Sequence, residues 1–215
     1  MVKLVSDTID KNNINKLIEW LSQDNIPKLT KGTLTIELEK KWAEKIGTKY
    51  SVYVNSGSSA NLAAIYSLML SNRMRNKKIV VPAVSWVTTV TPAIQLGLEP
   101  IMCECDVDNL GLDINHLKEI IKKDDPSAII LVHVLGIPNN MDEIVELCNE
   151  NNILLVEDTC ESIGSKYNDK MVGTFGDIMT LSFYPAHHIT MGEGGAIGTN
   201  SDELKVIIES FRDWG

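Results

Sequence analysis

The segment from Ser182 to Gly195 contains the densest group of residues able to do chemistry. It joins a serine to two adjacent histidines, His187 and His188, and ends in a glycine-rich turn. An imidazole titrates near neutrality, so a histidine here can act as a general acid or base. Consecutive residues rarely coordinate one ion and no third ligand is near, which argues against zinc. The turn is no dinucleotide fingerprint, because no helix opens there. Taken alone, the two histidines could be structural or metal ligands, and the metal-ligand alternative is the weaker one.

A second group of polar residues opens a helix. Ser56, Gly57, Ser58 and Ser59 follow a short apolar run and lead directly into an apolar helical stretch. The first amides of a helix have no partner within the helix and lie at its positive end, so such a turn can hold a phosphate. It is not a Walker loop, because no lysine follows the glycine. Taken alone, the turn would more often be an ordinary helix cap.

Three further residues follow predicted strands. Trp86 could offer a flat face to a planar ring, although a tryptophan more often packs in the core. Asp158 ends a buried apolar run, so its carboxylate needs a cationic or proton-donating partner. A protonated pyridine nitrogen is such a partner, as in pyridoxal enzymes. His133 follows another strand and could either line the same pocket or be structural.

Periodicity indicates the elements that position these residues. Apolar residues recur at helical spacing before Pro27, and Thr33 can cap a second helix that turns Leu34 inward and ends at Gly47. Buried runs then alternate with helices, which predicts an α/β fold with a mostly parallel sheet covered on both faces. Ligands bind such sheets beyond the C-terminal ends of the strands. We expect strands near 51–54, 79–81, 100–103, 128–132, 153–156, 179–183 and 196–199, and helices near 58–71, 86–96, 115–122, 141–149 and 202–211.

Composition narrows the classes of partner. The 215 residues suffice for one large domain and are marginal for two. A net charge of −9 without a basic stripe argues against nucleic acid. No apolar run has the length to cross a membrane, and the N-terminus does not resemble a signal peptide. The four cysteines are scattered, which fits a reducing compartment better than a disulfide framework. We therefore expect a cytoplasmic protein with no nucleic-acid or membrane partner.

Taken together, five blocks resemble a known family. Residues 54–62, 81–89, 157–164, 173–177 and 182–195 are similar, in order and spacing, to the DegT/DnrJ/EryC1/StrS family of sugar aminotransferases and dehydratases. The resemblance implies the three-layer α/β/α fold of aspartate aminotransferase-like enzymes that depend on pyridoxal 5′-phosphate. It also implies a role for each matching residue: Ser58, Ser59 and Ser182 bind the cofactor phosphate, Trp86 stacks on the pyridine ring, Asp158 pairs with the pyridine nitrogen, and Glu161 lies near the ring hydroxyl.

One position departs from the aminotransferases. They have a lysine five residues after the serine that matches Ser182, and this lysine bonds covalently to the cofactor; here the residue is His187. The departure resembles the family's 3-dehydratase branch, whose members act on nucleotide-linked 4-keto-6-deoxy sugars for deoxysugar and lipopolysaccharide O-antigen synthesis. The resemblance implies an enzyme that holds pyridoxal or pyridoxamine 5′-phosphate noncovalently and uses His187 as the base, with Glu161 tuning His187 or the ring hydroxyl. Separate segments resemble CDP-linked and GDP-linked members, so the nucleotide stays open.

Two other functions stay open, an aminotransferase of the same family and a noncatalytic pyridoxal-binding fragment. The resemblance divides the chain into an N-terminal arm, residues 1–32, and a cofactor-binding large domain, residues 33–215. It places the family's small C-terminal domain beyond Gly215, together with the cysteines that hold a [2Fe–2S] cluster in CDP-linked members. It also implies a homodimer, a nucleotide-linked keto-sugar substrate and, for members with that cluster, a reductase partner.

Overall fold

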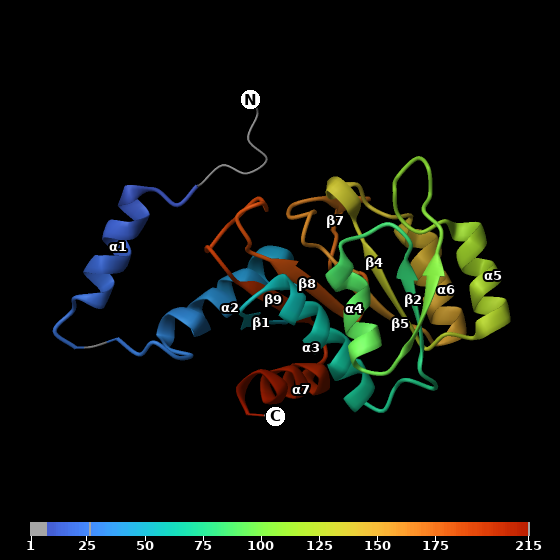
Figure 1. The fold of residues 1–215 in the computed structure, drawn as a ribbon, viewed down its shortest axis with the longest axis horizontal. Helices are drawn as coiled ribbons and strands as arrows, with labels where there is room; N and C mark the ends of the chain where they lie inside the picture. Colours follow the sequence, from blue (N-terminus) through green and yellow to red (C-terminus); the bar gives the residue numbers. More distant parts are fainter. Residues whose placement is uncertain (1–7, 26, 215) are drawn as a thin grey trace.

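A seven-stranded sheet forms the middle of the fold (Figure 1). The structure is a computed structural model that describes residues 8–25 and 27–214. The strand order is β1-β9-β8-β5-β4-β2-β3, and β9 alone runs against the others, which confirms the mostly parallel sheet. The strands are β1 (Tyr50–Val54), β2 (Lys78–Pro82), β3 (Glu99–Cys103), β4 (Ala128–Val132), β5 (Leu154–Asp158), β8 (Ile178–Ser182) and β9 (Gly195–Thr199).

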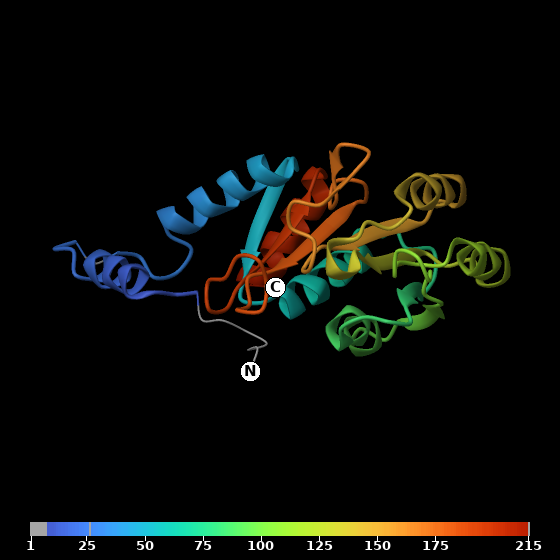
Figure 2. The same ribbon diagram turned by 90° about the horizontal axis from the view of Figure 1, so that it is seen from above.

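Helices cover both faces of the sheet, which gives the three layers that the sequence predicts (Figure 2). One face packs against α3 (Gly57–Leu70), α4 (Val87–Gln95) and α7 (Asp202–Asp213). The other face packs against α2 (Thr33–Ile46), α5 (Ile114–Asp124) and α6 (Met141–Asn151). None of the described helices is both long and apolar enough to cross a membrane.

The central strands are buried on both faces, and their side chains alternate between the two cores. In β4, Ala128 and Ile130 belong to the core under α3, whereas Ile129 and Leu131 belong to the core under α5 and α6. This alternation is the two-residue period of a strand. Each fully buried branched side chain contributes about 1.5–3 kcal/mol of burial free energy. The strand ends are therefore held firmly at the edge where the loops begin.

The N-terminal helices differ from the rest. Helix α1 (Lys11–Leu21) contains no buried residue, and Figure 1 shows it apart from the sheet. Gly32 rather than Thr33 is the N-cap of α2, and Leu34 is 53% exposed, so both expectations for that turn were wrong. The reason is that only the C-terminal part of this helix, which is about 21 Å long, packs against the sheet. Its buried residues are Trp42, Ala43 and Ile46. Gly47 ends it with a positive φ, as expected.

Two short elements were not predicted. A two-stranded hairpin pairs β6 (Lys166–Tyr167) with β7 (Lys170–Met171), and a 3-10 turn, η1 (Val134–Gly136), follows β4. Runs of two or three residues have no periodicity that a sequence pattern could reveal. The turn after β4 nevertheless lies at the same edge of the sheet as the candidate site.

Candidate active site

The candidate residues follow strands that end at one edge of the sheet. β8 ends at Ser182, β5 ends at Asp158, and β2 leads through a short segment to Trp86. In the sheet β8 is next to β5, and β4 lies between β5 and β2. Ligands of open α/β sheets bind beyond these C-terminal ends. The fold therefore brings the groups that the sequence singled out to a common edge.

Helix α3 begins with free backbone donors. The Oγ of Ser56 accepts a hydrogen bond from the amide of Ser59 at 3.1 Å, and the Ser56 carbonyl accepts from the amide of Ala60. The amides of Gly57 and Ser58 have no acceptor within the described part of the chain. They lie at the positive end of the helix dipole. This turn can therefore donate to an anion, with the hydroxyls of Ser58 and Ser59 beside it.

Ser182 lies against the start of this helix. A Cβ atom on Gly57 would come within 2.5 Å of the Ser182 Cβ, and one on Gly195 within 2.3 Å of the Ser56 carbonyl oxygen. Real Cβ contacts are never this short, so the close approach of β8, β9 and α3 requires glycine at both positions. Ser182 is consequently held beside the free amides of α3. Three serines and two amides form a site suited to a phosphate.

Asp158 is buried at the end of β5 and accepts hydrogen bonds from neutral donors. Its Oδ2 accepts from Asn61 Nδ2 and from Thr89 Oγ1, both at 2.9 Å, and its Oδ1 accepts from the amide of Cys160 at 3.1 Å. Among the described residues no lysine, arginine or histidine forms an ion pair with it. A buried carboxylate without a cation is costly, so this group suits a ligand that carries a protonated nitrogen.

Asp158 is held by residues that no sequence motif indicates. Asn61 comes from α3, Thr89 from α4, and Thr180 of β8 donates to Asn61 Oδ1 at 2.6 Å. Asn61 is 1% exposed, although it lies in an apolar stretch of helix one turn after Gly57. A lone amide at that place was the one available signal, because a buried polar group must find a partner. The carboxylate is thus tied to three elements.

Trp86 is positioned by the same network. It is the N-cap residue of α4, one turn before Thr89, and it is 72% exposed. An aromatic ring that is not packed in the core leaves a face free for a planar ligand. The more common role of a tryptophan, core packing, does not apply here.

His187 lies in the loop that joins β8 to β9. The neck of this loop is closed by two hydrogen bonds, from the Met191 amide to the Phe183 carbonyl and from the Phe183 amide to the Gly194 carbonyl. His187 is half-buried, whereas His188 is exposed. Burial lowers the pKa of His187 below 6.5, while the charges of Glu161 and Asp158 act to raise it. His187 is therefore mostly neutral at pH 7 and able to accept a proton.

Glu161 is held by a backbone amide in the loop that follows β4. Its Oε2 accepts from the amide of Leu135 at 2.8 Å. Leu135 follows β4, so this bond joins the loop after β5 to the loop after β4. The carboxylate is held where its charge acts on His187. Neither Lys170, which lies over the Phe175 ring, nor Lys205, which pairs with Glu209, is placed to act for His187.

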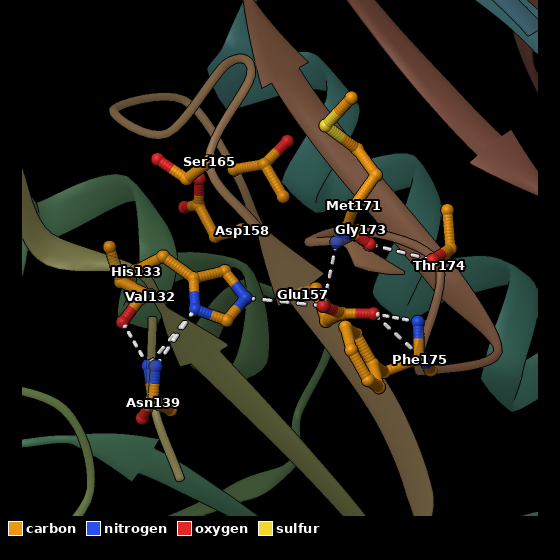
Figure 3. Close-up of polar contacts among 12 residues, drawn as sticks. Val132, His133, Asn139, Glu157, Asp158, Ser165, Met171, Gly173, Thr174 and Phe175 are labelled. Atoms are coloured by element: carbon orange, nitrogen blue, oxygen red, sulfur yellow. Dashed lines mark hydrogen bonds and ion pairs between the residues drawn. The ribbon is translucent and has the colours of Figure 1, made fainter. Parts of the chain in front are cut away.

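His133 does not line the site. It is fully buried, its Nε2 lies 3.1 Å from Glu157 Oε2, and its Nδ1 accepts from the amide of Asn139 (Figure 3). An Nδ1 that accepts places the proton on Nε2, so the ring donates to Glu157. Glu157 precedes Asp158 and points to the opposite face of the sheet. The structure thus decides in favour of the structural interpretation of His133.

These groups fit a phosphorylated aromatic cofactor with a basic ring nitrogen. The serines and free amides of α3 suit the phosphate, Trp86 suits the ring, and Asp158 lacks the cation that such a nitrogen would supply. The described residues contain no group of three or more histidine, cysteine or acidic side chains that could hold a metal ion.

The family profile of the "DegT/DnrJ/EryC1/StrS aminotransferase family" matches residues 7–215. The chain is 45% identical over 192 residues to the lipopolysaccharide biosynthesis protein RfbH of Salmonella typhimurium, covering 87% of this chain and 44% of that protein. It is 43% identical to a dTDP-4-dehydro-2,6-dideoxy-D-glucose 3-dehydratase of Saccharopolyspora spinosa, covering 82% and 39%. The structure of Escherichia coli GDP-4-keto-6-deoxy-D-mannose-3-dehydratase with bound hydrated PLP superposes with a TM-score of 0.90, at 38% identity, covering 99% and 54%. The chain thus spans about half the length of the relatives that it matches.

Proposed function

Because this chain belongs to the DegT/DnrJ/EryC1/StrS aminotransferase family, we propose that its site holds pyridoxal 5′-phosphate or the aminated form, pyridoxamine 5′-phosphate. Ser58, Ser59 and Ser182 would bind the phosphate, Trp86 would stack on the ring, and Asp158 would receive the pyridine N–H. The fit of these groups supports the proposal, as does the relative whose structure carries bound PLP. With His187 in place of a lysine, the cofactor would be held without a covalent bond to the chain.

We propose further that the protein removes the C3 hydroxyl of a nucleotide-linked 4-keto-6-deoxy sugar. When bound, the aminated cofactor supplies an amine for the C4 ketone and a conjugated ring that can store an electron pair. The neutral imidazole of His187 would take a proton from the C4′ carbon of the aminated cofactor and donate it to the departing C3 oxygen, which would leave as water. Glu161, held by the Leu135 amide, would stabilise the protonated imidazole by its charge.

His187 is the observation that carries this proposal. An aminotransferase needs an amine at that position for covalent exchange of the cofactor, and imidazole cannot provide it. The other groups of the site remain in place, since Asp158, Trp86 and the α3 turn have the surroundings described above. The names of the relatives include two sugar 3-dehydratases, one linked to dTDP and one to GDP, which supports a nucleotide-linked substrate.

The organisation of the whole protein is part of the proposal. Residues 33–215 would form the cofactor-binding domain and residues 1–32 an arm, of which 1–7 and 26 lie outside the described residues. The exposed apolar residues of α1 support a second subunit as its cover, hence a homodimer. They are Ile14, Leu17, Ile18 and Leu21. A reductase partner belongs to the proposal only for a protein that carries the [2Fe–2S] cluster of the CDP-linked members.

The test is a product assay. The protein is incubated with pyridoxamine 5′-phosphate and either GDP-4-keto-6-deoxy-D-mannose or dTDP-4-keto-6-deoxy-D-glucose. Mass spectrometry distinguishes a sugar that has lost its C3 oxygen from one that has gained an amine at C4. We expect the sugar that has lost its C3 oxygen and no sugar with an amine at C4. A 4-amino product, or a cofactor that borohydride fixes to the wild-type chain, would show that a lysine serves and that the dehydratase proposal is wrong.

A further inference from the structure

The turn after β4 presents a leucine in a backbone conformation that leucine rarely adopts. Leu135, in η1, has a φ of +52° and a ψ of +23°, in the left-handed region. Outside glycine, asparagine and aspartate this region is disfavoured, because Cβ crowds the following carbonyl. The Leu135 side chain is nevertheless 75% exposed. Burial in the core therefore does not explain why an apolar residue is held there.

Four contacts hold this turn in place. The Leu135 amide donates to Glu161 Oε2 at 2.8 Å, and Ser165 Oγ donates to the next carbonyl, that of Gly136, at 2.7 Å. Before the turn, His133 is fixed by Glu157 and by the Asn139 amide (Figure 3). Strained conformations persist where surrounding structure over-determines them, and such places cluster at active sites and ligand clamps. The turn is thus built to keep one orientation.

The sheet order places Leu135 within the candidate site. β4 lies between β5, which carries Asp158, and β2, which leads to Trp86. Leu135 is bonded to the carboxylate whose charge acts on His187. The turn therefore places the backbone of Leu135 against Glu161, and its branched apolar side chain is exposed at this edge of the sheet. An apolar side chain adds no chemistry to proton transfer, but it can contact an apolar part of a ligand.

We propose that Leu135 is a specificity-determining residue that contacts the C6 methyl group of the sugar. The inference rests on the proposed function and deepens it. A 6-deoxyhexose has hydroxyl groups at most ring carbons, and its C6 methyl is the substituent that an aliphatic side chain would recognise. The parent hexose has a hydroxyl at C6, which would lose its hydration against Leu135 without gaining a partner. The site would therefore select 6-deoxy sugars.

The experiment compares ligands that differ only at C6. Dissociation constants are measured by calorimetry, with the PLP-loaded protein, for GDP-6-deoxy-D-mannose against GDP-D-mannose and for dTDP-6-deoxy-D-glucose against dTDP-D-glucose. The test variant is Leu135→Asn, because asparagine accepts a positive φ and leaves the turn unstrained while removing the apolar contact. Leu110→Asn is the matched control, since Leu110 has a φ of +60° in the loop after β3. Leu135→Met keeps an apolar contact.

We expect the wild-type protein to prefer the 6-deoxy ligand by about tenfold to a hundredfold, the range for one group in an apolar subsite. The preference should fall to about twofold or less in Leu135→Asn and persist in Leu110→Asn and Leu135→Met. An unchanged ratio in Leu135→Asn, or no preference in the wild type, would overturn the inference while leaving the dehydratase intact. If the wild type binds none of the four ligands at millimolar concentration, the proposed nucleotide-sugar function fails and this inference fails with it.

Discussion

Replacing Glu157 by glutamine should destabilise the protein strongly, although the change is nearly isosteric. Both oxygens of the carboxylate accept two hydrogen bonds in a fully buried position. Oε1 accepts from the amides of Phe175 and Gly176, each at 2.7 Å, and Oε2 accepts from the Gly173 amide at 2.7 Å and from His133 Nε2 at 3.1 Å (Figure 3). All four partners are donors. A glutamine side chain has one oxygen that can accept from two of them, but its NH₂ group is itself a donor and cannot accept from the other two.

The magnitude follows from counting the donors that glutamine would leave. The amide oxygen can replace only one carboxylate oxygen, so two donors would face the NH₂ group whichever way the side chain is turned. If His133 moved its proton to Nδ1 to accept from that group, the proton would oppose the Asn139 amide, which donates to Nδ1. A buried donor without an acceptor costs about 1–3 kcal/mol, so two cost about 2–6 kcal/mol. The total free energy of unfolding of a domain is typically about 5–15 kcal/mol.

The assay is urea unfolding followed by far-UV circular dichroism and tryptophan fluorescence. Glu157→Gln should shift the midpoint to clearly lower urea with an unchanged slope, because the surface exposed on unfolding is the same. Glu119→Gln, an exposed glutamate on α5, is the matched control and should leave the midpoint unchanged. If Glu157→Gln lowers the free energy of unfolding by less than about 0.5 kcal/mol, the scale of an ordinary surface substitution, the reasoning is refuted. The network would then tolerate an unpaired donor.

Three further predictions concern the site. His187→Lys should give a cofactor that borohydride fixes to the chain, with new visible absorbance, whereas His188→Lys should not, because His188 is exposed and His187 half-buried. Burial lowers the pKa of His187 from its ordinary value of 6.5, so its neutral form is half lost only at a pH below that value. The wild-type pH profile of kcat/KM should therefore fall on the acidic side with a midpoint below 6.5, and a midpoint above 6.5 would contradict the assignment. Asn61→Leu should remove one donor from buried Asp158, lower the unfolding free energy by about 1–3 kcal/mol and raise the Kd for pyridoxal 5′-phosphate in a fluorescence titration; unchanged affinity would show that Asp158 needs no fixing.

The order of the elements could be predicted because the apolar runs are short, buried on both faces and separated by helical periodicity. The α3 turn was predictable for a similar reason, since Gly57 and its serines lie directly between a strand and a helix. The contacts that fix Asp158 were not. Asn61 and Thr180 are 119 residues apart in the chain, and nothing local to either residue indicates that they share a hydrogen bond.

His133 and Leu135 show where sequence reasoning about loops fails. A polar residue directly after a strand was a reasonable candidate for the pocket, yet His133 is buried, and Leu135, an unremarked leucine two positions later, is exposed at the edge of the site. The cause is the 3-10 turn with its left-handed residue, which redirects the chain immediately after β4. A three-residue turn has no period, and a leucine gives no hint of a positive φ.

Glu157 and Asp158 show how a strand assigns different roles to neighbouring carboxylates. Adjacent residues of β5 point to opposite faces of the sheet. On one face Glu157 finds four donors among the described residues, so it needs nothing from a ligand and can serve only to tie the loops together. On the other face Asp158 is also buried, but among the described residues it receives only neutral donors and no cation, so its charge is left for a partner that these residues do not supply. The contrast follows from which helices and loops cover each face. We therefore expect that exchanging the two residues would abolish both functions, although the strand would keep its composition and its net charge.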